Sequence, residues 1–101
     1  MAMQYELVLQ FALAPRDVAR FDRITEFENR LERRREHPTV DGDKLYALDG
    51  SDCKLGYIEV RLVTNDPPRA FEAIRGTMPQ SCPCEVGYRA ADSGDALAPL
   101  P

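Results

Sequence analysis

The sequence predicts a single α+β domain with the element order β-α-β-β-α-β, and three observations carry this prediction. Residues 4–14 and residues 56–64 alternate between apolar and other side chains, a period of two that is typical of strands with one buried face. Apolar residues recur at helical spacing over residues 17–36, and a helix-start signal with two prolines occupies residues 65–68. A chain of 101 residues forms one core and excludes a large two-domain enzyme.

The first strand and the first helix are separated by Pro15, which ends the alternation. The apolar side of this strand consists of Tyr5, Leu7, Leu9, Phe11 and Leu13. The helix follows from Asp17 to Glu36, with an apolar stripe at Val18, Phe21, Ile24, Phe27 or Glu28, and Leu31. A helix of ~20 residues is ~30 Å long and a six-residue strand covers about 20 Å, so we expect the helix to overhang the sheet. The overhang should be its charged end, Glu32 to His37.

The next two strands are expected to form a hairpin. A weak alternation over residues 45–48 precedes Asp49-Gly50-Ser51-Asp52, which we interpret as the turn because Asp-Gly is a strong turn former. In the strand after it, Ile58, Val60 and Leu62 alternate with Tyr57, Glu59, Arg61 and Val63.

The second helix should begin after Asp66, whose side chain can accept hydrogen bonds from first-turn amides, and Pro67 suits the first helical position. Its buried stripe is predicted to be Ala70, Phe71, Ile74 and Met78. A last strand is expected over residues 84–90. The domain should then span residues 1–91, followed by a proline-containing tail, residues 92–101, which either adds an edge strand or frays.

This element order is that of the ferredoxin-like fold, a two-layer sandwich in which two helices cover one face of a four-stranded antiparallel sheet. If the strongly apolar positions of the central strands face the helices, the alternate positions face away from them. We call these alternate positions the open sheet face: Glu6, Val8, Gln10, Glu59, Arg61 and Val63. The face mixes charged and aliphatic side chains, so it is either solvated or meets a partner.

Three stretches of the chain resemble a group of small uncharacterised bacterial proteins. They are Tyr5-Glu6-Leu7-Val8-Leu9-Gln10-Phe11, Val40-Asp41-Gly42 and Thr64-Asn65-Asp66-Pro67. The resemblance covers about residues 5–71, and its most specific piece is the first strand. It implies the same β-α-β-β-α-β layout and names no activity. The relatives finish in a further strand, whereas this chain finishes in a tail with prolines.

Net charge argues against nucleic acids as partners, and the lack of long apolar runs argues against membranes. Thirteen Lys and Arg residues against 17 Asp and Glu residues give a formal charge of -4, which disfavours binding to nucleic acid phosphates. No apolar run approaches the ~18 residues needed to cross a bilayer, and the first residues lack the features of a signal peptide. The three cysteines are an odd number, unlike the framework of a secreted disulfide scaffold. We therefore expect a soluble cytoplasmic protein with reduced thiols and neither nucleic acid nor membrane as a partner.

The cysteines and the single histidine do not predict a metal or redox centre. Cys53, Cys82, Cys84 and His37 match a zinc site in composition, but structural zinc ligands usually pair as C-x₂₋₄-C and these do not. The Cys82 and Cys84 pair follows the end of the second helix, where the helix dipole does not stabilise a thiolate. The expectation is therefore no metal and no cofactor.

The ionisable residues do not predict a catalytic centre either. Glu6 and Glu59 lie on the open sheet face and could form an acid/base dyad, but Arg61 beside them favours a surface ion-pair cluster. His37 stands alone at a helix end, where a solvated role is favoured. We therefore expect a non-catalytic protein.

Acidic residues gather around the second predicted strand beside two tyrosines, a combination that proteins use to steer and anchor a basic partner. The predicted partner site is Asp41, Asp43, Tyr46, Asp49, Asp52 and Tyr57. We expect a small acidic binding or regulatory module, in its concrete form an inhibitor of the immunity-protein kind that docks a basic protein. Two alternatives stay open. One is a homodimer that packs two open sheet faces around a small-molecule or enzymatic pocket, and the other is a thiol or metal sensor.

Overall fold

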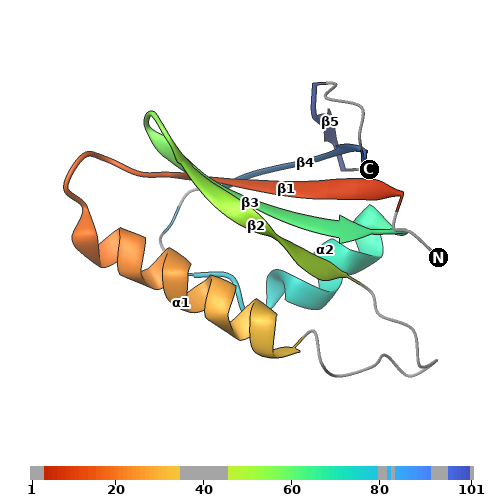
Figure 1. Ribbon diagram of the computed structural model, residues 1–101, viewed down its shortest axis with the longest axis horizontal. Helices are drawn as coiled ribbons and strands as arrows, with labels where there is room; N and C mark the ends of the chain where they lie inside the picture. The colour runs from red at the N-terminus through yellow and green to blue at the C-terminus, as the bar shows by residue number, and fades with distance from the viewer. Residues whose placement is uncertain (1–3, 35–45, 80–81, 83, 92–95, 101) are drawn as a thin grey trace.

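Figure 1 shows the computed structural model, in which two helices cover one face of a five-stranded antiparallel sheet with the order β2-β3-β1-β4-β5. The structure describes residues 4–34, 46–79, 82, 84–91 and 96–100. The elements are β1 (Tyr5–Ala12), α1 (Val18–Arg34), β2 (Ala47–Lys54), β3 (Tyr57–Thr64), α2 (Pro67–Arg75), β4 (Cys84–Ala90) and β5 (Ala98–Pro99). The α+β class is confirmed, whereas the prediction of four strands is wrong because the C-terminal segment adds a fifth.

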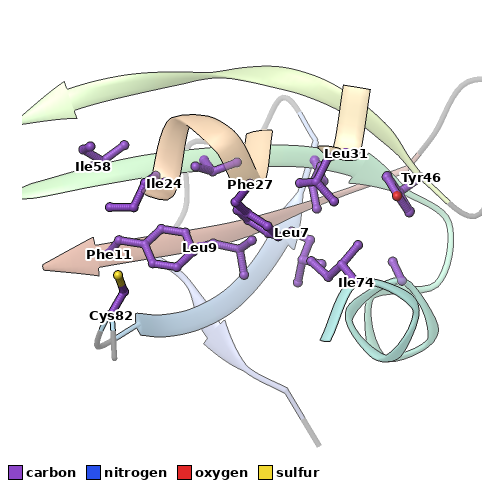
Figure 2. Close-up of a cluster of buried hydrophobic side chains, with 13 residues drawn as sticks. Leu7, Leu9, Phe11, Ile24, Phe27, Leu31, Tyr46, Ile58, Ile74 and Cys82 are labelled. Atoms are coloured by element: carbon purple, nitrogen blue, oxygen red, sulfur yellow. The ribbon is translucent and has the colours of Figure 1, made fainter. Parts of the chain in front are cut away.

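The hydrophobic core lies between the sheet and the helices (Figure 2). Its centre is β1, the middle strand, whose Leu7, Leu9 and Phe11 side chains are fully buried under the two helices. The rings of Phe11 and Phe27 meet edge to face with their centroids 5.7 Å apart, a favourable geometry for an aromatic pair. The strongly apolar side of each central strand therefore faces the helices as predicted. The remaining buried core residues are Ile24, Leu31, Tyr46, Ile58, Val60, Leu62, Ala70, Ile74 and Cys82.

The first turn of α1 lies outside this core, contrary to the expected stripe. Val18 is 66% exposed and Phe21 is 45% exposed, whereas Ile24, Phe27 and Leu31 are buried. The apolar stripe therefore projects past the core at the N-terminal end of the helix. The overhang was predicted at the opposite, charged end, of which residues 35–37 lie outside the described part of the chain.

The β2–β3 hairpin turns later than predicted. The segment from Asp49 to Asp52 belongs to β2, and the turn consists of Leu55 and Gly56. Gly56 has φ +86°, in the region that glycine enters without a steric penalty. Gly50, which was expected to form the turn, instead sits beside a β-bulge between Leu48 and Gly50 in the pairing with β3.

The second helix is built as its sequence predicts. The Asp66 side chain accepts a hydrogen bond from the Arg69 amide at 3.2 Å, and Pro67 occupies the first position of the helix. Ala70 and Ile74 are buried, while Phe71 and Met78 pack half-buried against the core.

The fifth strand crosses next to a glycine of β4. Gly87 pairs with Pro99 and Tyr88 pairs with Ala98. A Cβ atom added at Gly87 would lie 2.7 Å from the Leu97 Cβ and 3.1 Å from the Ala98 carbonyl oxygen. The close approach of the tail to the sheet therefore depends on glycine at this position.

We expect the substitution Gly87→Ala to detach β5, because a strand of two residues yields more easily than the central sheet. The cost in the free energy of unfolding should be about 1 kcal/mol, the low end for overpacking. The measurement is the loss of nuclear Overhauser contacts between Leu97 and residue 87. Gly76→Ala is the matched control, because a Cβ at Gly76 meets nothing within 4 Å. Unchanged contacts in Gly87→Ala would contradict this packing.

Candidate functional site

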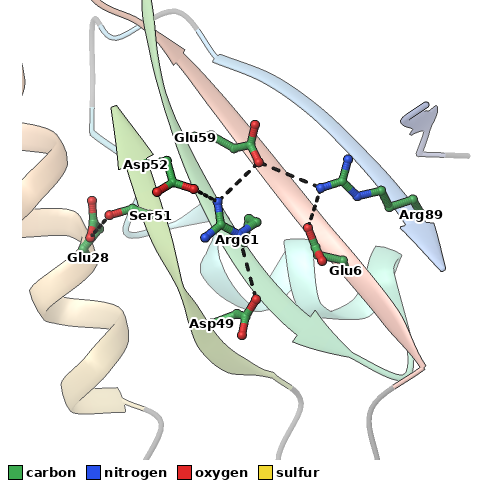
Figure 3. A network of polar contacts seen from close by, with 8 residues as sticks. All are labelled: Glu6, Glu28, Asp49, Ser51, Asp52, Glu59, Arg61 and Arg89. Atoms are coloured by element: carbon green, nitrogen blue, oxygen red, sulfur yellow. Dashed lines mark hydrogen bonds and ion pairs between the residues drawn. The ribbon is translucent and has the colours of Figure 1, made fainter. Parts of the chain in front are cut away.

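The open sheet face carries a network of ion pairs centred on Arg61 (Figure 3). The guanidinium hydrogen-bonds to Asp52 of β2. Its Nη1 lies 3.5 Å from the Glu59 carboxylate, and its Nε lies 3.9 Å from that of Asp49. One arginine of β3 therefore gathers three carboxylates. The prediction of an ion-pair cluster around Arg61 is confirmed.

A second arginine, Arg89 of β4, extends the network across β1. Its Nη2 lies 2.7 Å from the Glu6 carboxylate and 3.9 Å from that of Glu59. Glu59 thus lies between two guanidiniums, and its side chain is only 11% exposed. A carboxylate buried to this degree requires such compensation, because removing a charge from water is costly.

The β-bulge in β2 explains how Asp49 and Asp52 reach the same arginine. Side chains three residues apart in a regular strand point to opposite faces of the sheet. Here Gly50 pairs with Arg61 and Asp52 pairs with Glu59, so Asp49 is an extra residue and the alternation shifts at this point. Ser51, between them, faces the helix side, where its hydroxyl donates a hydrogen bond of 2.9 Å to Glu28 of α1.

The pKa values of Asp52 and Arg61 are shifted by their contact with each other. The hydrogen bond and the charge of Arg61 hold the pKa of Asp52 below its ordinary value of 3.8. Burial opposes the charge of Arg61, but the hydrogen bonds and charges of Asp52 and Glu59 outweigh burial and raise the pKa of Arg61. Both groups are therefore charged at neutral pH.

The three uncharged residues of the open sheet face are buried or half-buried. Val8 is fully buried, although its position in the strand faces away from the helices. Its partners in register are Arg61 and Gly87, and Leu97 of the tail packs against Gly87. Gln10 and Val63 are half-buried. The expectation that Val8 is available to a partner is therefore wrong, because its side chain is fully buried.

The residues of the predicted partner site are only partly brought together. Asp49 and Asp52 both contact Arg61 on the open sheet face (Figure 3). Tyr46 is 8% exposed and belongs to the core, so its expected role as a surface anchor is a mistake. Tyr57 is half-buried beside Lys54 in register. Asp41 and Asp43 lie outside the described residues.

Two contributors to the site were missed in the sequence. Arg89 lies on a strand where Glu85, Gly87 and Arg89 alternate with the more apolar Val86 and Tyr88, and this alternation was a usable signal. The position of Leu97 over Gly87 had no local signal, because it depends on where the tail crosses β4.

The three cysteines differ in their exposure to solvent. Cys53 is exposed, Cys82 is buried and Cys84 is half-buried, and all three are free. Burial raises the pKa of Cys84 to about 12, so its thiol is protonated at neutral pH and is a poor nucleophile. Within residues 4–34, 46–79, 82, 84–91 and 96–100, no group of three or more His, Cys, Asp and Glu side chains is arranged to hold a metal ion. His37 lies outside this part of the chain.

Alkylation of the native protein with iodoacetamide at pH 8 should modify Cys53 first. The pKa of about 12 at Cys84, against an ordinary 9.0, lowers its thiolate fraction about a thousandfold. Mass spectrometry of the digested protein measures the two rates, and urea-unfolded protein, in which all three thiols react, is the control. Equal native rates at Cys53 and Cys84 would contradict the burial of Cys84.

No protein-family model, curated protein or solved structure matches this chain. The resemblance to a group of small bacterial proteins therefore stays a prediction. Neither helix in the described part of the chain combines the length and the apolar character needed to cross a membrane.

Proposed function

We propose that this protein is a non-catalytic binding or regulatory module whose open sheet face docks a basic protein partner. The observation that carries the proposal is the excess of carboxylates in the Arg61 network. Four carboxylates surround two guanidiniums, which leaves a formal charge of -2 on one face. The side chains of Asp49 and Asp52 are 49% and 50% exposed, so they are the ones that a partner can reach.

Arg61 is a positioning residue in this proposal. It contacts both Asp49 and Asp52 on the outer strand of the hairpin, so a partner's Lys or Arg meets carboxylates that are already oriented. Acidic surfaces of this kind mainly raise the association rate and select partners of opposite charge. An inhibitor of the immunity-protein kind is the concrete form that we propose.

The arginine partners of Glu6 and Glu59 favour a binding role over acid/base catalysis. A catalytic dyad requires two carboxylates that share a site and compete for one proton. Here Glu6 is held by Arg89 at 2.7 Å, and Glu59 lies between Arg89 and Arg61. Both carboxylates therefore pair with guanidinium groups and not with each other.

A homodimer through two open sheet faces is disfavoured by the same charges. Two identical faces with a formal charge of -2 each would repel, and the aliphatic Val8 at the centre is already covered. We also propose a ferredoxin-like arrangement of the four longer strands, supported by the order β2-β3-β1-β4 and both helices on one face. The three free thiols support a reducing compartment such as the cytoplasm.

Affinity capture from an extract of the source cell tests the proposed function with three immobilised proteins. The wild type and the control Glu26→Gln/Glu72→Gln, which removes two exposed helix carboxylates, should retain the same basic protein. Asp49→Asn/Asp52→Asn, which removes the same charge from the open sheet face, should lose it. Equal retention by all three proteins, or capture of acidic proteins alone, would refute the docking surface.

A further inference from the structure

The loop after β1, the first turn of α1 and the turn of the β2–β3 hairpin lie at the same end of the molecule (Figure 1, left). Residues of these three segments line a groove. Its volume is about 440 Å³, within the range of ligand-binding clefts. We call it the end groove and define it by Leu13, Arg16, Val18, Phe21, Lys54 and Leu55.

The lining of the end groove is apolar and exposed. Leu55 at the tip of the hairpin is 101% exposed, Val18 is 66% exposed and Phe21 is 45% exposed. Single exposed apolar side chains are ordinary, but three around one hollow form a patch of the kind that marks interaction sites. Covering such a patch removes apolar surface from water and therefore favours binding.

The walls of the end groove are held in place by hydrogen bonds. The Leu13 amide donates to the Gly56 carbonyl at 3.0 Å, which ties the loop after β1 to the hairpin turn. The Asp17 side chain accepts from the Arg20 amide at 3.1 Å and pairs with the Arg20 guanidinium at 3.6 Å. The groove is thus formed before anything binds, and the charge of Asp17 is already compensated.

The end groove is lined by two cationic side chains, Arg16 and Lys54, and by Asp17, which is paired with Arg20. Arg16 and Lys54 line the groove, and neither makes an ion pair within the ranges of the chain that the structure describes. The groove therefore presents two cations beside an apolar surface, on a chain with a net charge of -4.

We infer that the end groove docks an acidic amphipathic segment of a partner protein, one that places apolar side chains against Phe21 and Leu55 and carboxylates near Arg16 and Lys54. This site adjoins the open sheet face at Lys54, whose charge also acts on Asp52, and it requires a partner of the opposite charge. The module would then have two docking surfaces, the open sheet face for a basic partner and the end groove for an acidic one.

The charges select this occupant over two others. A second copy of the chain, related by two-fold symmetry, would bring the Arg16 and Lys54 cations of both copies together. An anionic bilayer would face the net charge of -4, whereas a short segment senses mainly the charges within about 8 Å. The hollow shape also suits inserted side chains rather than a flat surface.

Fluorescence anisotropy with two matched synthetic peptides tests the inference. Both are amphipathic helices with the same leucine face, and the polar face is glutamate in one and lysine in the other. The glutamate peptide should bind at least about tenfold more tightly, and the difference should shrink as salt is added.

Substitutions then locate the binding. Leu55→Ser should weaken the glutamate peptide about tenfold, because a buried leucine contributes about 1.5 kcal/mol or more. Arg16→Gln/Lys54→Gln should weaken it about fivefold, whereas Arg33→Gln/Arg69→Gln, which removes the same charge elsewhere, should not. All these side chains are exposed, so folding is preserved, as an unfolding curve will check.

Three results would overturn the inference: no binding of the glutamate peptide, equal binding of both peptides, or binding that Leu55→Ser leaves unchanged. Sedimentation with vesicles of phosphatidylcholine and phosphatidylserine in equal parts, if tighter than peptide binding, would assign the groove to a membrane instead. Asp49→Asn/Asp52→Asn should not weaken peptide binding, because it removes carboxylates and leaves Arg16 and Lys54 in place. Failure here is therefore distinguishable from failure of the basic-partner site.

Discussion

The substitution Phe27→Ala is expected to lower the free energy of unfolding by about 3–5 kcal/mol, the cost of deleting a fully buried aromatic side chain. Phe27 is 1% exposed and packs edge to face against Phe11 of the central strand. Its loss leaves a cavity at the contact between α1 and β1. Urea unfolding followed by circular dichroism measures the change.

Phe21→Ala is the matched control on the same helix, because Phe21 is 45% exposed. It should cost about 1 kcal/mol or less, since much of its ring is already in water. If Phe27→Ala is too unstable to measure, Phe27→Leu should cost an intermediate amount. Equal costs for Phe21→Ala and Phe27→Ala would show that the assignment of the buried stripe is incorrect.

Replacing Arg61 by methionine should lower the free energy of unfolding by about 2–3 kcal/mol, below the 3–5 kcal/mol typical of fully buried pairs because the site is partly solvated. Without Arg61, the cation that remains near Glu59 is Arg89, at 3.9 Å. The Glu59 side chain is only 11% exposed, so water compensates its charge poorly. Asp49 and Asp52 would also lose their shared partner, and the charge of Lys54 acts only on Asp52. Urea unfolding at neutral pH measures the effect.

Arg30→Met is the control for this prediction. Arg30 pairs with Glu26 at 2.7 Å on the exposed side of α1, and such pairs contribute about 0.5 kcal/mol or less. Adding Glu59→Gln to Arg61→Met should restore part of the lost stability, because it removes the stranded charge. A cost for Arg61→Met no larger than that for Arg30→Met would mean that the network does not stabilise the sheet.

The sequence was sufficient for elements whose signals are local. The alternation of β1, the Asp66-Pro67 start of α2 and the strand from Cys84 to Ala90 all depend on neighbouring residues, and the structure has them as predicted. The fifth strand does not follow from the sequence, because a tail with prolines either pairs at an edge or frays depending on the space beside β4.

The hairpin shows why a local signal can mislead. Asp49-Gly50 is a strong turn former, but glycine also suits a β-bulge, and the sequence does not distinguish the two uses. The pairing of Gly50 with Arg61 and of Asp52 with Glu59 decides between them, and that pairing is a property of the whole sheet.

The sequence predicts which charged residues form the candidate site, but it does not predict which side chains of the site are exposed. Alternation correctly placed Glu59 and Arg61 away from the helices, and their opposite charges favoured the ion pair. Burial of Val8 and Tyr46, in contrast, depends on contacts with distant segments that no short pattern encodes. The exposed first turn of α1 likewise follows from the extent of the core beneath it.

The account depends most on Arg61 holding the carboxylates of the open sheet face in one charged cluster. Carboxyl NMR during a pH titration tests this directly at Asp52, whose pKa the hydrogen bond and charge of Arg61 lower. Because the folded-state pKa is depressed, the stabilisation is present above the unfolded value and is lost as the pH falls through the lowered one. We predict a midpoint below 3.8 for the wild type and a return toward 3.8 in Arg61→Met. An Asp52 midpoint at or above 3.8 in the wild type, or the same midpoint in both proteins, would contradict the account.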